Sequence, residues 1–217
     1  MPALSDCHLM VLAAGRGTRM GGPKALRSLP ESPWWREQQA RLSRVPCPAT
    51  WVVSEPVRAA LSTSEGAPER VVSAEDGLPM FESILTGLSH IECHERPHPA
   101  GVFILPIDTP APGPDTWARL ADTGVVAAPS YNGEHGHPVF LPWDWAVGNA
   151  LRRPHQGRIE SPLRLDRLIA PIIRYIPVND PDVTVDLDTP EDLHAFIDRN
   201  QQHRPRNAGP GPTLPPR

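Results

Sequence analysis

The chain alternates short apolar runs with segments that carry apolar residues at helical spacing. Short apolar runs bounded by glycine, proline or serine are typical of buried strands. The strands predicted in this way cover residues 8–15, 49–54, 69–73, 101–107, 125–130, 137–142, 172–178 and 183–187. Helices are predicted over 33–44, near 57–62, over 81–91, near 115–122, near 143–152, near 162–169 and from Thr189 onward. Strands separated by helices indicate an α/β fold, a mainly parallel twisted sheet with helices on both faces.

The first predicted helix, over 33–44, begins with Ser32 as N-cap and Pro33 in its first turn. Its exposed side is expected to carry Arg36, Glu37, Gln38 and Arg41. The neighbouring Trp34 and Trp35 could pack in the core or form a surface for a partner. We favour the core, because tryptophans are usually highly buried.

The length of 217 residues fits a single domain, which we place at residues 1–200. Residues 201–217 are rich in proline and glycine and show no apolar periodicity. A flexible tail is therefore predicted for this last stretch. The sequence shows no repeat that would indicate a solenoid.

The charge balance restricts the partners of the protein. Lysine and arginine together number 21, against 25 aspartates and glutamates, which gives a formal net charge of −4. No global positive field attracts nucleic acid or anionic lipid, so any bound phosphate must be held locally. No apolar run approaches the roughly 18 residues of a membrane helix, and the N-terminus lacks the regions of a signal peptide. We expect a cytoplasmic protein that binds neither nucleic acid nor membrane.

The three cysteines, Cys7, Cys47 and Cys93, lie far apart and form no C-x-x-C pair. This pattern predicts reduced thiols without a chemical role. A second cluster, His90, Cys93, His94 and His98, has spacings that a zinc site could use. We favour a solvated helix end, because the segment runs directly into prolines.

The loop over residues 12–26, LAAGRGTRMGGPKAL, combines four glycines with three cations. Glycines allow backbone N–H groups to turn toward an anion, so this composition predicts a phosphate cradle. The loop is not a P-loop, since Ala25 follows Lys24 where a serine or threonine is needed. It does not fit G-x-G-x-x-G either, since Met20 occupies the third glycine position. Lys24 is the only lysine in the chain, which indicates a position that needs a compact ammonium group.

Carboxylates follow two of the predicted strands. Asp108 comes directly after the apolar run 101–107, and ligands of open α/β sheets bind beyond the carboxyl ends of strands. A carboxylate there can hold Mg²⁺ together with substrate phosphates. Asp186 and Asp188 are expected to point to opposite faces of the last strand, so that only one of them faces the site. The alternatives are a turn-initiating role for Asp108 and a helix N-cap role for Asp188.

The glycine-rich loop resembles the L-A-A-G-x-x-x-R-M-G-x-P-K pattern of the MobA-like NTP transferase family, which includes molybdenum cofactor cytidylyl- and guanylyltransferases. Four further segments are similar to blocks of this family in the same order: GLPMFESILTGL (77–88), LPIDTP (105–110), HGHPVFL (135–141) and VDLDTPEDL (185–193). The stretch 155–168 departs from the G-D-x-G-x-R element of the family. The resemblance implies the Rossmann-like fold of the nucleotide-diphospho-sugar transferases.

This resemblance also implies an activity, the transfer of a nucleoside monophosphate from an NTP to a phosphate on a small acceptor, with release of pyrophosphate. Lys24, Arg19 and Asp108 would be catalytic, and the resemblance selects Asp188 to bind Mg²⁺ together with Asp108. The implied nucleotide contacts are Leu12, Ala13, Ala14, Gly15, Arg16, Gly17, Gly77 and Ser83. The implied acceptor contacts are Gly136 and His137.

The segment Ala13-Ala14-Gly15 resembles the cytidylyl branch of the family. CTP is therefore favoured over GTP, with molybdopterin as acceptor and a molybdoenzyme or its chaperone as a protein partner. One alternative is a sugar 1-phosphate or another small phosphate as acceptor. The other is a nucleotide-binding regulatory protein without turnover.

Overall fold

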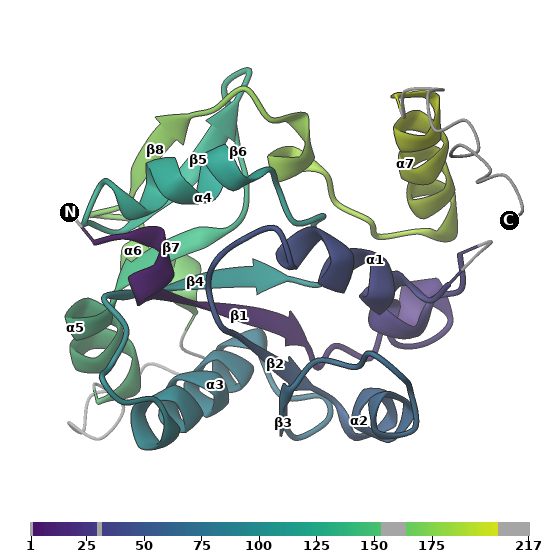
Figure 1. The fold of residues 1–217 in the computed structure, drawn as a ribbon, viewed down its shortest axis with the longest axis horizontal. Coiled ribbons are helices and arrows are strands. Elements are labelled where there is room, and N and C mark those ends of the chain that lie inside the picture. Colours follow the sequence, from purple (N-terminus) through teal and green to yellow (C-terminus); the bar gives the residue numbers. More distant parts are fainter. Residues whose placement is uncertain (1, 30–31, 153–163, 204–217) are drawn as a thin grey trace, which may run out of the picture.

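The computed structural model describes residues 2–29, 32–152 and 164–203 (Figure 1). Eight strands among these residues form one sheet. They are β1 (Cys7–Ala13), β2 (Ala49–Val53), β3 (Arg70–Ser73), β4 (Gly101–Pro106), β5 (Ala127–Tyr131), β6 (Glu134–His135), β7 (Val139–Pro142) and β8 (Arg174–Pro177). The strand order is β3-β2-β1-β4-β7-β5-β6, and β8 pairs with β5.

The sheet has a parallel half and a mixed half. β2 pairs in parallel with β1 and β3, and β1 pairs in parallel with β4. β7 then runs antiparallel to both β4 and β5, β6 runs antiparallel to β5, and β8 runs parallel to β5. The carboxyl ends of β1 and β4 consequently lie side by side, which is where an open α/β sheet binds its ligand.

Helices cover both faces of the sheet. The α-helices are α1 (Trp34–Leu42), α2 (Glu55–Ser62), α3 (Met80–His94), α4 (Pro114–Ala121), α5 (Trp143–Trp145), α6 (Leu165–Ile169) and α7 (Pro190–His203). Short 3₁₀-helices are η1 (Leu4–Asp6), η2 (Thr18–Met20), η3 (Lys24–Leu26) and η6 (Pro181–Thr184), and η4 (Ala146–Leu151) is a π-helix. Figure 1 shows α1 and α4 on one side of β1 and β4, and α3 and α5 on the other.

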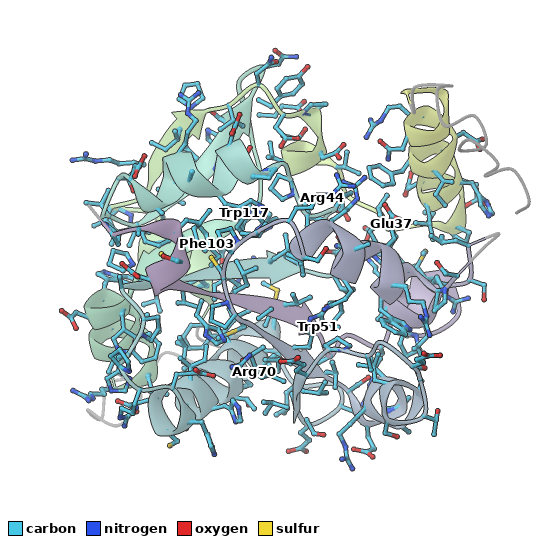
Figure 2. The ribbon with its side chains drawn as sticks, viewed as in Figure 1. Glu37, Arg44, Trp51, Arg70, Phe103 and Trp117 are labelled. Carbon is cyan, nitrogen blue, oxygen red and sulfur yellow. The ribbon has the colours of Figure 1, made fainter. Side chains whose placement is uncertain are left out.

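The core consists of two apolar layers, one on each face of the sheet. Alternate residues of β1 enter different layers: Leu9 and Val11 pack with α1, α2, α4 and α7, whereas Met10 packs with α3. This alternation is the strand period of two. Phe103 of β4 and Trp117 of α4 meet in the first layer, edge to face with ring centroids 5.1 Å apart (Figure 2). The sheet that carries the site is therefore buried on both sides.

Most predicted elements are confirmed, as is the α/β fold class, and Trp34 and Trp35 are both buried in the core. Three expectations about these elements are wrong. Helix α1 begins at Trp34 with Pro33 as its N-cap residue, so Ser32 does not cap it. Residues 183–187 form no strand, because Pro181–Thr184 is a 3₁₀-helix and the chain after it joins no ladder. Gln38 is not on an exposed helix side but fully buried, and the Arg41 side chain is largely buried as well, because both contact the loop after β4.

Some expectations fall on residues outside the described part of the chain. Helix α7 extends to His203, three residues into the segment expected as a tail, and 204–217 are not described. Most of the stretch 155–168 is also outside the described residues. In the described part of the chain, no helix has the length and apolar character needed to cross a membrane.

Candidate active site

The loop after β1 folds back on itself through its glycines. Gly17 has a φ of 58°, and a Cβ atom there would lie 2.0 Å from the carbonyl oxygen of Gly22. The Gly17 carbonyl accepts hydrogen bonds from the amides of Met20 and Gly22, at 2.9 and 3.0 Å. Only glycine fits this close approach. The fold-back brings Lys24, at the start of η3, beneath the carboxyl ends of β1 and β4.

Lys24 joins three distant segments. Its Nζ atom donates to Asp108 Oδ2 at 2.9 Å and to Asp188 Oδ1 at 2.6 Å, and its side chain is 15% exposed. Burial disfavours the ammonium, but hydrogen bonds to the two carboxylates outweigh that cost and raise the pKa of Lys24. Lys24 hydrogen bonding also lowers the pKa of Asp188, whose Oδ2 accepts a second bond from Arg19 Nη1 at 2.9 Å. Lys24 and Asp188 are therefore charged at neutral pH.

Asp186 belongs to the same cluster, contrary to the expectation that it points away. Asp108, Asp186 and Asp188 each offer a carboxylate oxygen, and these atoms lie within 4.8 Å of one another. Residues two apart in extended chain point to the same side, so Leu187 between them is the one that turns into the core. Burial and the two neighbouring carboxylates raise the pKa of Asp186. Three acids with one lysine form a site that suits a cation.

The helix N-cap alternative for Asp188 does not hold. Thr189 and Asp192 cap α7 reciprocally: the Asp192 carboxylate accepts from the Thr189 amide at 2.8 Å, and the Thr189 hydroxyl accepts from the Asp192 amide at 3.2 Å. This is a capping-box arrangement. Asp188 is left to bond Lys24 and Arg19.

A cavity of about 200 Å³ opens beside Lys24 and Asp108. Most of the expected nucleotide contacts line it, namely Leu12, Ala14, Gly15, Arg16, Gly17, Gly77 and Ser83. Ala13 does not, because its side chain packs in the core. Leu78 and Met80 also line the cavity and are 45% and 54% exposed, although no role was expected for them. Two large exposed apolar side chains at a cavity mouth can cover a flat ring.

The Arg16 guanidinium packs directly against Gly77 in the lining of this cavity. Gly77 has a φ of 84°, and a Cβ atom there would lie 2.3 Å from the Arg16 guanidinium. Arg16 Nη2 donates to the Asp76 carbonyl at 3.5 Å. The absence of a side chain at residue 77 therefore lets the guanidinium cross over the loop before α3.

Gly136 and His137 contact Val183, which precedes Asp186 and Asp188 in the chain, and they do not line the cavity. A Cβ atom on Gly136 would lie 2.0 Å from the Val183 carbonyl, and that carbonyl accepts from the His137 amide at 2.9 Å. Burial lowers the pKa of His137, and the negative charge of Asp108 opposes this shift. Its Nδ1 atom is buried without a hydrogen-bond partner in the described part of the chain. Buried polar atoms normally have a hydrogen-bond partner, so an ordered water or a ligand group is expected at this nitrogen.

The histidines of α3 form a different arrangement. His90 and His94 stack with ring centroids 4.2 Å apart, and His98 stacks on Trp143 at 5.3 Å. Across residues 2–29, 32–152 and 164–203, the acidic triplet is the one group of three side chains placed to hold a metal ion.

The chain was compared with known proteins. A model of the MobA-like NTP transferase domain matches residues 9–168. A search of curated proteins found no match.

Several solved structures have the same fold. The Rv0371c homologue from Mycobacterium sp. strain JC1 is 23% identical with a TM-score of 0.73, and the alignment covers 91% of this chain and 98% of that one. Rv0371c from Mycobacterium tuberculosis in complex with manganese is 20% identical, with a TM-score of 0.65 and coverages of 88% and 98%. Molybdopterin-guanine dinucleotide biosynthesis protein A from Archaeoglobus fulgidus is 17% identical, with a TM-score of 0.64 and coverages of 90% and 99%.

These likenesses agree with the fold, and the family model covers well over half of the sequence. The chain therefore belongs to the MobA-like NTP transferase family and is a nucleotidyltransferase.

Proposed function

We propose that the protein transfers a nucleoside monophosphate from an NTP to a phosphate on a small acceptor and releases pyrophosphate. The observation that carries this proposal is the Lys24 ammonium group, held between Asp108 and Asp188 at the edge of a glycine-lined cavity. Transfer of this kind depends mostly on positioning and on neutralising phosphate charge. A buried ammonium beside paired carboxylates provides both.

The acidic cluster fits a divalent cation, and we propose Mg²⁺. Asp108, Asp186 and Asp188 bring three oxygens within 4.8 Å, and the two cationic groups that bond them, Lys24 and the exposed Arg19, contact Asp108 and Asp188. Burial, together with the negative charges of Asp108 and Asp188, raises the pKa of Asp186. Hard cations of this kind prefer carboxylate oxygens together with phosphates. Mg²⁺ held there would supply positive charge to the reacting phosphate oxygens.

The protein's own groups divide the remaining work. Gly15 and Gly17 line the cavity, and backbone amides of this loop would bind the phosphates. Arg19 is largely exposed, so it can swing from Asp188 to the leaving pyrophosphate. Lys24 is buried and less free to move, and it would hold the oxygens of the phosphate under attack. Binding of the nucleotide thus exchanges internal ion pairs for contacts with phosphate.

We further propose CTP as the donor, in preference to GTP, and molybdopterin as the acceptor. The Ala13-Ala14-Gly15 segment supports the choice of base, and Ala14 and Gly15 line the cavity. The name of the Archaeoglobus neighbour supports a molybdopterin acceptor. Gly136 and His137 would contact that acceptor, in the cytoplasm, and the product would pass to a molybdoenzyme or its chaperone.

The test is pyrophosphate release by the purified protein with each of the four NTPs against a panel of phosphorylated acceptors. Molybdopterin, a sugar 1-phosphate and a polyol phosphate cover the alternatives. Turnover with CTP and molybdopterin is expected. Nucleotide binding without turnover in every combination would favour a regulatory protein, and turnover with a sugar phosphate would replace the acceptor.

A further inference from the structure

Helix α1 presents polar side chains to the interior of the protein. Trp34, Gln38 and Arg41 lie at positions i, i+4 and i+7, which places them on one face of the helix. All three donate hydrogen bonds to backbone carbonyls between Ile107 and Ala111. This short segment follows β4 and carries Asp108.

Gln38 is at the centre of that face and is fully buried. Its Nε2 group donates to the Thr109 carbonyl at 2.7 Å, and its Oε1 atom accepts from the Ala111 amide at 2.8 Å. The two bonds fix the orientation of the amide, because a reversed amide would set donor against donor at Ala111. Trp34 Nε1 adds a bond to the Ile107 carbonyl at 2.7 Å. The backbone is thus held on both sides of Asp108.

The same segment is tied to the other two acids. The Asp108 carbonyl accepts from the Leu187 amide at 2.9 Å, and Leu187 separates Asp186 from Asp188. A shift of residues 107–111 would therefore displace Asp108 and disturb the segment that carries Asp186 and Asp188. Loops carry catalytic groups accurately only where such supporting contacts lock them.

We infer that Gln38 is a positioning residue that sets the geometry of the Asp108, Asp186 and Asp188 cluster through the backbone of residues 107–111. It does not line the cavity, and it acts by fixing the peptide groups around Asp108. The inference rests on the proposed function in assigning a divalent cation to this cluster. It adds that the cation's affinity depends on a buried amide of α1.

The test replaces the amide with an apolar side chain of similar shape, Gln38→Met. The matched control is Thr50→Val, which removes a buried hydrogen bond, the 2.8 Å contact with His8, far from the acidic cluster. Both variants should lose thermal stability. Mn²⁺ affinity, measured by electron paramagnetic resonance, should fall roughly 10- to 100-fold in Gln38→Met only, as for other residues that support metal ligands. The kcat for pyrophosphate release should fall by a similar factor, with the KM for NTP nearly unchanged.

A milder variant guards against the loss of folding. Trp34→Phe removes one hydrogen bond to Ile107 and keeps an aromatic ring, and it should weaken Mn²⁺ binding in the same direction by a smaller factor. If Gln38→Met does not fold, Trp34→Phe decides the outcome. Unchanged Mn²⁺ affinity in the variant that decides, or an equal loss in Thr50→Val, would show that α1 supports only the fold.

The metal measurement also separates this inference from the proposed function. A wild-type protein that binds Mn²⁺ in a Gln38-dependent way but releases no pyrophosphate would refute the activity and keep the positioning role. A wild-type protein without measurable Mn²⁺ affinity would overturn the positioning role itself.

Discussion

Buried ionisable groups differ in charge between the two ends of the parallel strands. We call the end where β1 and β4 finish the carboxyl edge, and the opposite end the amino edge. At the carboxyl edge, Lys24 and Asp188 are charged because they bond each other. At the amino edge, burial lowers the pKa of His8 to about 4 and raises those of Cys7 and Cys47 to about 11 and 12. Lys24 and Asp188 are thus charged at neutral pH, whereas His8, Cys7 and Cys47 are neutral.

This difference in charge distinguishes groups that can act on a ligand from groups that only stabilise the fold. A buried group without a counter-charge gives up its charge, since desolvation disfavours the ionised form. His8 accordingly shares a hydrogen bond with Thr50, and the Cys47 thiol donates to the Leu4 carbonyl. Keeping several charges together at the carboxyl edge costs stability unless a ligand uses them. Mutations at the carboxyl edge are therefore expected to change activity more than mutations at the amino edge.

The largest effect is expected from removing one charge at the carboxyl edge. Asp108→Asn keeps the shape of the side chain but cannot supply the negative charge that holds Mg²⁺. Turnover should fall by about 10³ or more, while the fold is retained. Pyrophosphate release at saturating Mg²⁺ measures this, with circular dichroism as the check on folding. Full activity in the variant would remove Asp108 from the metal site.

The next largest effect is expected from changing the shape of the cationic group at residue 24. Lys24→Arg should fail almost as badly as Lys24→Ala, because a planar guanidinium cannot take the place of an ammonium 2.6 Å and 2.9 Å from two carboxylates. Both variants should lose on the order of 10²–10³ in kcat, with much smaller changes in KM. Steady-state kinetics with the preferred NTP decide the matter. Near-normal turnover in Lys24→Arg would mean that the single lysine is an accident of composition.

The carboxyl edge could be predicted largely from sequence. The glycine-rich loop and Asp108 each follow a predicted strand of a mainly parallel sheet, and ligands of such sheets bind beyond the carboxyl ends of the strands. Likewise Phe81, Ile84 and Leu88 have helical spacing, and all three are buried on one side of α3. Apolar patterns that repeat within one helix or strand therefore predict its buried face well.

Features that depend on distant backbone groups could not be predicted. The glutamine at 38 resembles a surface residue in sequence, and its burial depends on carbonyls some 70 positions away. The strand β6 did have a local signal, since Asn132-Gly133 is a two-residue hairpin loop with positive φ at both positions. The prediction for Asp186 is wrong because side chains two residues apart in an extended segment point to the same side, so Asp186 and Asp188 share a face.

At the amino edge, a smaller effect is expected, and it depends on pH. The pKa of His8 is about 4 in the folded protein against a reference value of 6.5. Below pH 6.5 His8 is protonated in the unfolded chain but not in the native protein. The stability of the native protein therefore decreases as the pH is lowered from 6.5 to about 4. One proton amounts to about 1.4 kcal/mol per pH unit, or roughly 3 kcal/mol over this range.

Urea unfolding of wild type and His8→Gln between pH 4 and 7.5 measures the contribution of His8. The slope of stability against pH should be shallower in the variant by about one proton. His194→Gln serves as control, because His194 is exposed on α7 and its replacement should leave the slope unchanged. Identical slopes for wild type and His8→Gln would show that His8 is protonated inside the fold.

The smallest effect is expected at the thiols. Cys7 is buried and Cys47 is partly buried, both with raised pKa values, whereas Cys93 is exposed on α3. Only a thiolate reacts with iodoacetamide at an appreciable rate. Mass spectrometry of the native protein at pH 8 should therefore find label on Cys93 well before the other two. Because the Cys93 side chain is exposed, its labelling should leave Tm and turnover nearly unchanged. Rapid labelling of Cys7 or Cys47 would show that the amino edge opens to solvent, and the contrast between a charged edge and a neutral one would then need another cause than burial.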